Sequence, residues 1–263
     1  MGHYALDNVA AQAADRFLAL ETCYDPVTRA HLTATGLGPG WHCLEVGGGG
    51  GSVGTWLAEQ VAPEGRVTVT DIAPDRMADA PLPDNLRVIR HDIVHDPLPE
   101  DTYDLVHARL VLLHLPERLD VLARLVRSLR PGGLLVLEEF DCRWTPVLAA
   151  PDPAAADLFH LVHDAFLARL AHAGADVQWG SRIYQALRDA GLHEVAATTY
   201  SQAWPGASPA IALHRANSVQ LRGELLDSGI SAQQLQDFWN LLENPAFAVS
   251  SYPLTTACGR RAP

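Results

Sequence analysis

The sequence has 263 residues, 48% of them hydrophobic, which is enough to bury the core of one elaborated α/β domain. Its formal net charge of −12, with no basic run, excludes large nucleic-acid partners because an acidic surface repels phosphate backbones. No apolar run of about eighteen residues and no basic-then-apolar leader is present, so we expect no membrane span, no secretion signal and a cytoplasmic location.

Strand and helix patterns alternate between residues 40 and 140. The strands are short apolar runs that end at turn residues, and the helices carry apolar residues at helical spacing. The expected strands are 41–46, 66–71, 86–90, 103–108 and 134–140, and the expected helices are 52–61 and 117–129. This alternation predicts parallel βαβ units in a doubly wound α/β sheet.

Helical patterns flank this core on both sides. Before it, Val9, Ala13, Phe17 and Leu20 recur at helical spacing, and Asp25-Pro26 predicts a helix start. After it, helices are expected over 152–171 and 180–191 and from Ser208 and Ser231 onward, with strands over 193–200 and 246–259. Pro253 interrupts the last strand, which favours an edge or bulged strand over a central one.

The strongest local signal is the loop Leu44-Glu45-Val46-Gly47-Gly48-Gly49-Gly50-Gly51, between a strand and a helix. Ligands of open parallel sheets bind beyond the carboxyl ends of the strands, and glycines there let the backbone approach a cofactor. A plain turn is disfavoured because consecutive glycines lose much entropy on folding. Read from Gly49, the loop matches the dinucleotide fingerprint Gly49-x-Gly51-x-x-Gly54.

Read from Glu45, the loop is Glu45-x-Gly47-x-Gly49-x-Gly51, which resembles motif I of class I S-adenosylmethionine-dependent methyltransferases. Asp71, at the end of the second strand, suits the ribose hydroxyls in both interpretations. Asp92 follows the third strand, where the resemblance implies a contact with the adenine amino group, and it favours the methyltransferase. Residues 103–109 and 129–136 resemble the family's fourth- and fifth-strand segments.

The resemblance covers residues 40–140 and implies a Rossmann-like, seven-stranded sheet with an antiparallel last strand. It also implies N-terminal helices and helical lid insertions around one domain. We expect a cap over 1–35, a cofactor-binding core over 40–141 and a lid insertion over 204–245, within a single domain 1–263. The cofactor contacts that it implies are Glu45, Gly47, Gly49, Gly51, Asp71, Ile72, Asp92, Ile93, Ala108 and Arg109.

Methyl transfer from a sulfonium is an in-line displacement, so the protein aligns the acceptor, excludes water and manages one proton. Side chains near the strand ends are the candidate acid–base groups: Glu138, Glu139, His107, His114 and Tyr24. Strand alternation places Glu138 and Glu139 on opposite faces. For each candidate the alternative is a hydrogen-bonded core side chain or a solvated acid.

No metal site is expected. His160-x-x-His163-Asp164 lies on one helix face but lacks further ligands, and the four cysteines are scattered without CxxC spacing. The helical additions hold most of the aromatic residues, which predicts a pocket for a neutral, partly aromatic small molecule between the carboxyl edge of the sheet and residues 1–35, 141–175 and 204–245.

The sequence thus predicts a methyltransferase acting on an O, N or C nucleophile of a small metabolite, with S-adenosylmethionine as cofactor. The five-glycine loop and Glu138-Glu139-Phe140-Asp141 resemble bacterial enzymes of specialised metabolism. The first alternative is an NAD(P)-dependent Rossmann oxidoreductase, disfavoured because the chain has no lysine for a Tyr-x-x-x-Lys pair. The second is a non-methylating S-adenosylmethionine-binding member of the fold. The acceptor scaffold and the oligomeric state stay open, and a homodimer is compatible with the sequence.

Overall fold

A seven-stranded sheet forms the centre of the computed structural model, which describes residues 13–78 and 81–263. Its strand order is β3–β2–β1–β4–β5–β10–β7. The bounds are β1 (His42–Val46), β2 (Arg66–Asp71), β3 (Leu86–Arg90), β4 (Tyr103–Arg109), β5 (Leu129–Phe140), β7 (His193–Tyr200) and β10 (Leu254–Arg260). The first five strands pair in parallel, while β10 is antiparallel to β5 and β7. The doubly wound, Rossmann-like sheet with an antiparallel last strand is confirmed.

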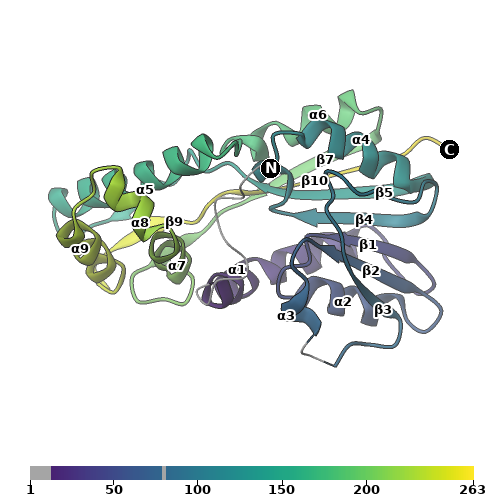
Figure 1. Cartoon of the computed structure of the whole chain (residues 1–263), viewed down its shortest axis with the longest axis horizontal. Coiled ribbons are helices and arrows are strands. Elements are labelled where there is room, and N and C mark those ends of the chain that lie inside the picture. The colour runs from purple at the N-terminus through teal and green to yellow at the C-terminus, as the bar shows by residue number, and fades with distance from the viewer. Residues whose placement is uncertain (1–12, 79–80) are drawn as a thin grey trace.

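Helices cover both faces of this sheet (Figure 1). The apolar side of α2 (Ser52–Val61) packs on one face, and α4 (Arg118–Ser128) and α6 (Ile183–Asp189) pack on the other. The short helix α3 (Asp75–Ala78) follows β2. The chain also has two 3-10 turns: η1 (Leu112–His114) follows β4, and η2 (Trp179–Ser181) precedes α6. Consecutive residues of β5 alternate between the two apolar clusters, as the pleat of a strand buried on both sides requires.

A helical lobe lies beside the sheet, at the left of Figure 1. It consists of α5 (Pro153–His172), α7 (Ala212–Gln220), α8 (Arg222–Asp227), α9 (Ala232–Leu242) and the small sheet β6 (Val147–Ala149), β9 (Ala248–Ser250) and β8 (Ala203–Pro205). A third apolar cluster, rich in aromatic rings, fills it. The long helix α1 (Ala13–Ala34) contacts both α2 and α7 and so joins the lobe to the sheet.

Two proline-based expectations are wrong. Pro26 lies inside α1 instead of starting a helix, because the Asp25 side chain pairs with Arg29 and Arg109 and does not cap. The helix loses one backbone hydrogen bond at Pro26 and continues. Pro253 separates β9 from β10, and β10 lies inside the sheet, between β5 and β7, not at an edge.

The fifth strand also begins earlier than expected, at Leu129. The predicted turn at residues 130–133 is an exposed irregularity within β5, where the pairing with β4 jumps from Tyr103↔Leu129 to Leu105↔Leu134. Residues 1–12 of the predicted cap, with Val9, lie outside the described residues. No helix in residues 13–78 and 81–263 is long and apolar enough to cross a membrane.

Candidate functional site

The glycine loop joins β1 to α2 at the carboxyl edge of the sheet. Gly47 N and Gly48 N donate to Thr70 O at 2.7 and 3.1 Å, which ties the loop to the end of β2. Gly47, Gly49 and Gly51 have φ values of 70°, 55° and 89°, a region that other residues adopt only with strain. A Cβ at Gly48 would lie 2.2 Å from Val69 Cγ1. The three glycines of the motif are therefore required by the backbone itself.

Asp71 lies directly beneath this loop. Its carboxylate accepts hydrogen bonds from Gly49 N at 3.0 Å and Ala73 N at 2.8 Å, and the residue is only 6% exposed. Its neighbour Ile72 is 60% exposed, which is unusual for a large apolar side chain. The structure thus brings together the glycine loop and the second-strand acid, 22 residues apart in sequence.

Asp92 lies at the same edge, one strand further along. His91 N donates to Asp71 O at 2.9 Å, which places the end of β3 beside the end of β2. The Asp92 side chain accepts from Val94 N at 2.9 Å, and the adjacent Ile93 is buried. Acidic and apolar groups therefore line one continuous edge from Asp71 to Ile93.

Helix α1 covers the glycine loop, and sequence reasoning did not identify the two residues that do so. A Cβ at Gly49 would lie 3.0 Å from the Phe17 ring, and one at Gly50 would lie 2.1 Å from Glu21 Oε1. Burial and the charge of Asp25 raise the pKa of Glu21, although Arg109 and Ser52 oppose the shift. The helical spacing of apolar residues predicts only that Phe17 lies on the buried face of its helix. Local sequence does not show which part of the chain Phe17 contacts.

A buried chain of polar groups connects β1, β4 and β5. His107 Nδ1 lies 2.5 Å from Glu45 Oε2, and His107 Nε2 lies 3.5 Å from Glu138 Oε2. Glu138 also accepts from Thr28 of α1 and, at 2.7 Å, from Thr256 of β10. Glu45, His107 and Glu138 are at most 3% exposed, so we name them the buried ionic triad.

Burial and the neighbouring side chains act in opposite directions on the pKa values of His107 and Glu138. Burial disfavours the charged form of His107, but the side chains of Glu45 and Glu138 outweigh the effect of burial and raise the pKa of His107 to about 9. Burial likewise opposes ionisation of Glu138, yet the neighbouring imidazoles of His107 and His31, at 3.5 and 3.6 Å, hold the pKa of Glu138 below its usual range. A buried imidazolium between two carboxylates is stable only while all three partners are present.

Arg109 adds a second link between β4 and α1. Its guanidinium donates to Thr28 Oγ1 and to Asp25 Oδ1, both at 2.9 Å. The Arg109 and Asp25 side chains are 11% and 10% exposed. Ala108, the preceding residue, is fully buried within the sheet. The exit of β4 therefore fixes the middle of α1 next to the glycine loop.

The other predicted acid–base residues occupy different surroundings. Glu139 faces away from Glu138, as alternation predicts, and accepts from Leu112 N and Leu113 N at 2.8 and 3.3 Å. Burial raises its pKa to about 8. The Tyr24 hydroxyl donates to Tyr252 O at 3.0 Å. Desolvation, with Arg16 and Arg118, lowers the pKa of the partly exposed His114 to about 3.

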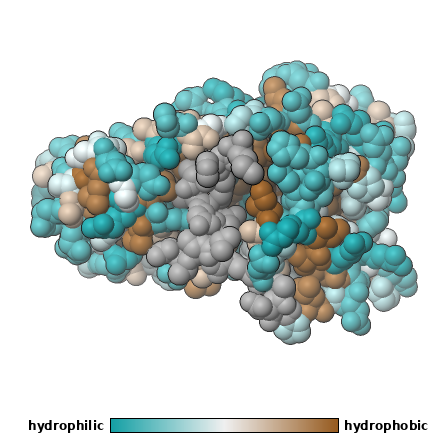
Figure 2. Space-filling view, in the orientation of Figure 1, coloured by the Kyte–Doolittle hydropathy of each residue, from teal (hydrophilic) through white to brown (hydrophobic). Residues whose placement is uncertain are grey.

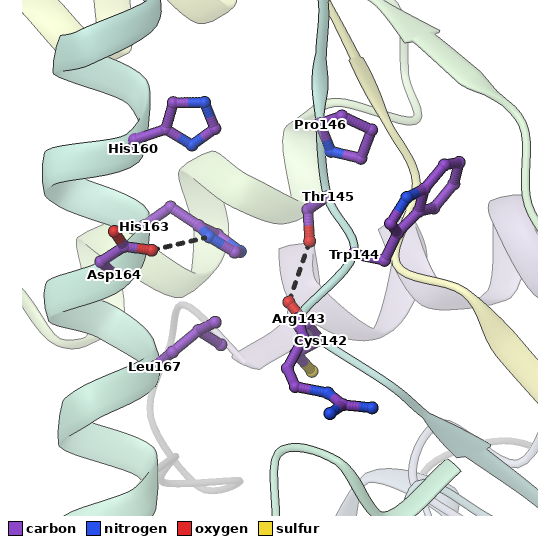
Figure 3. A pocket seen from close by; sticks show the side chains of 9 residues that line it. All are labelled: Cys142, Arg143, Trp144, Thr145, Pro146, His160, His163, Asp164 and Leu167. Atoms are coloured by element: carbon purple, nitrogen blue, oxygen red, sulfur yellow. Dashed lines mark hydrogen bonds and ion pairs between the residues drawn. The ribbon is translucent and has the colours of Figure 1, made fainter. Parts of the chain in front are cut away.

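The helical histidines do not form a metal centre with other side chains of the described chain, where no group of three potential ligands gathers. His160 is exposed, whereas His163 is buried and stacks on Phe159 with 5.4 Å between the ring centroids. A pocket of about 360 Å³ lies between this part of α5 and residues 142–146 (Figure 3).

Comparison with known proteins finds a likeness to methyltransferases over part of the chain. Residues 44–135 match the model of a methyltransferase domain. Methyltransferase str3 of Strobilurus tenacellus is 34% identical over 111 residues, covering 42% of this chain and 39% of that protein. The ubiquinone/menaquinone biosynthesis C-methyltransferase UbiE of Ectopseudomonas mendocina is 30% identical over 128 residues, covering 46% of this chain and 50% of its own length. The chain thus matches half or less of the length of these curated relatives.

A solved structure extends the likeness to the whole fold. Phosphoethanolamine N-methyltransferase 2 of Haemonchus contortus, in complex with phosphomonomethylethanolamine and S-adenosylhomocysteine, has a TM-score of 0.57 and 11% identity. The match covers 96% of this chain and 58% of that chain. The family model spans the glycine loop, Asp71, Asp92 and Arg109, while α1 and the helical lobe lie outside it.

Proposed function

We propose that the chain is a class I S-adenosylmethionine-dependent methyltransferase and that it methylates an O, N or C nucleophile of a small, neutral, partly aromatic metabolite. The observation that carries this proposal is the glycine loop, whose three left-handed glycines lie over Asp71 within the matched segment. When bound, S-adenosylmethionine would supply a methyl group activated by a positive sulfur and would leave as S-adenosylhomocysteine.

The residues at the sheet edge suit this cofactor. A carboxylate has about four acceptor positions, so Asp71 can bind ribose hydroxyls in addition to Gly49 N and Ala73 N. Ile72 offers an exposed apolar surface for a purine ring, and Asp92 an acceptor for its amino group. We keep Glu45, Gly47, Gly51, Ile93, Ala108 and Arg109 as proposed contacts or supports of the same site.

The chain's own residues would align the acceptor and exclude water. Phe17 and Glu21 of α1 close over the glycine loop, and Arg109 and Thr28 hold α1 there. We therefore assign His107 and Glu138 a positioning role, because the triad bonds to Thr28 and is sealed from solvent. Glu139, Tyr24 and His114 stay proposed acid–base or acceptor-orienting groups, and His114, neutral at physiological pH, is the partly exposed one of the three.

The first prediction concerns cofactor choice. Calorimetric titration of the purified chain is expected to give micromolar-range affinity for S-adenosylmethionine and S-adenosylhomocysteine and far weaker binding of NAD. The reason is the succession Glu45, Asp71 and Asp92 along the sheet edge. Tight NAD binding without a response to S-adenosylhomocysteine would favour the oxidoreductase alternative. Cofactor binding without methyl transfer to any acceptor of this class would favour the non-methylating alternative.

The second prediction concerns Asp71. Asp71→Ala removes the acceptor of Gly49 N and Ala73 N and the proposed partner of the ribose, so S-adenosylhomocysteine affinity should fall by about 1–3 kcal/mol. Asp75→Ala is the matched control, since Asp75 is an exposed acid of α3 that pairs with Arg90. Calorimetry on both folded variants tests this, and equal losses in the two would argue against a specific role of Asp71.

A further inference from the structure

The pocket beside α5 has two walls of different character. Residues 142–146, which follow β5, form one wall, and residues 160–167 of α5 form the other (Figure 3). Trp144 stands at the rim and is 58% exposed. Arg143 extends away from α5 in Figure 3, and its guanidinium is bound to Asp141 at 2.7 and 3.0 Å. The one cationic side chain of this wall is therefore already neutralised by an acid outside the pocket.

His163 points from α5 into this space (Figure 3). Its side chain is 5% exposed, and its Nε2 has no hydrogen-bond partner in the described part of the chain. Burial and the neighbouring His160 lower the pKa of His163 to about 4, so the ring is neutral at physiological pH. A buried polar atom without a partner is destabilising, and native proteins rarely leave one without a ligand or water.

A platform of rings surrounds His163. The His163 ring stacks on the rings of Phe159 and Tyr252, with centroid distances of 5.4 and 5.6 Å, and meets the His214 ring edge-on at 5.7 Å. His214 Nε2 and Trp204 Nε1 in the same cluster are also buried and, among the described residues, unpaired. These surrounding rings are buried and do not line the pocket, whose own aromatic side chains are Trp144, His160 and His163. The unpaired Nε2 of His163 and the exposed Trp144 indole suit a flat ligand with a polar group.

The pocket lies at the carboxyl end of β5, and packed aromatic residues join that end of the strand to α1. Cys142 follows the carboxyl end of β5 by two residues, on the edge where ligands of parallel sheets bind. Phe140, at that end, contacts both Tyr252 and Tyr24 of α1, at 5.2 and 5.1 Å. One turn before Tyr24, Glu21 lies against the glycine loop. A second pocket, of about 330 Å³, lies between α5 and α9 and includes no strand end.

We propose that the pocket between residues 142–146 and α5 is the acceptor site, and that it binds an uncharged, flat ring bearing a hydroxyl group that donates to His163 Nε2. The inference rests on the proposed function and adds the substrate class to it. A volume of about 360 Å³ suffices for a small bicyclic ring. The hydrogen bond anchors the ring and fixes its orientation in the pocket.

The test uses 2-naphthol and 2-methoxynaphthalene, two flat probes of which only the first donates a hydrogen bond. Ligand-observed NMR titration of the full chain should show about tenfold tighter binding of 2-naphthol, the equivalent of one hydrogen bond. His163→Phe should abolish this preference. His172→Gln should keep it, because His172 is exposed in the last turn of α5 and outside the pocket.

A second variant protects the test if His163→Phe does not fold. Leu167→Trp, at a partly exposed position of the pocket wall, should weaken both probes at least about tenfold by filling the space. An acceptor site must adjoin the position of the transferred methyl group. The dissociation constant of 2-naphthol should therefore differ about fivefold between protein saturated with S-adenosylhomocysteine and protein saturated with sinefungin, which carries an ammonium group at that position.

The outcomes separate this inference from the proposed function. Equal binding of the two probes, a preference that survives His163→Phe, insensitivity to Leu167→Trp, or indifference to the cofactor analogue would each overturn the acceptor pocket. S-adenosylhomocysteine titrations of the same preparations report on the function itself. If that ligand binds while the probes show no preference, the acceptor site fails alone, and if it does not bind the wild type, the proposed function fails.

Discussion

Gly49→Val is expected to weaken S-adenosylhomocysteine binding at least about a hundredfold, or about 3 kcal/mol. Gly49 has a φ of 55°, and a β-branched residue is strained there. Its Cβ would also meet the Phe17 ring at 3.0 Å, and the bond from Gly49 N to Asp71 would have to move. Calorimetry on variant protein whose fold is verified by circular dichroism measures the loss.

Gly50→Ala is the matched control for this prediction. Gly50 is not in the left-handed region, and its added Cβ would meet the carboxylate end of Glu21, a flexible side chain that can turn aside. Affinity should therefore change only a few-fold. Wild-type affinity in both folded variants would show that the loop is not the cofactor site.

The cofactor core was predictable from local sequence alone. Strands β2 and β3 have the expected bounds, and β1 and β4 differ from expectation by one residue at one end. Short apolar runs closed by glycine or aspartate leave little freedom in placing such strands. The bulge at residues 130–133 was read as a turn because proline and glycine signal both, and only the pairing with β4 distinguishes them.

The surroundings of the site were not predictable, because they come from distant parts of the chain. Thr28 and Thr256 reach Glu138 across 110 and 118 residues. No periodicity shows that a threonine of the first helix will bond to a carboxylate of the fifth strand. The same holds for Glu21, which the sequence offers as an ordinary surface acid. The residues proposed to bind a nucleoside follow a motif, whereas those that cover the glycine loop depend on tertiary packing.

The buried ionic triad gives the largest expected effect on stability. His107→Ala leaves Glu45 and Glu138 buried without their shared cation, so we expect the free energy of unfolding to fall by about 3–5 kcal/mol at neutral pH. Urea denaturation measures this. His172→Ala, at an exposed position of α5, should change stability by less than about 0.5 kcal/mol.

The pH dependence distinguishes a charge effect from a cavity left by the ring. His107 has a pKa raised from 6.5 to about 9, so its contribution to stability is complete below pH 6.5 and is lost as the pH rises through about 9. The lowered pKa of Glu138 makes its contribution complete above 4.5 and lost in stronger acid. In His107→Ala the two carboxylates lack a cation, so acid, which neutralises them, should relieve the defect.

The difference in stability between wild type and His107→Ala should therefore be greatest near pH 6, where the contribution of His107 is still complete, and should narrow toward acid and toward pH 9 and above. Burial raises the pKa of Glu139 to about 8, and because Glu139 faces away from Glu138, subtracting one curve from the other is expected to cancel its contribution. Urea midpoints of wild type and His107→Ala, measured across this range, give the comparison. The same measurement on His107→Gln shows the effect of a side chain that can form hydrogen bonds but carries no charge. A difference that stays constant with pH would assign the loss to packing and would remove the triad as the ionic support of α1.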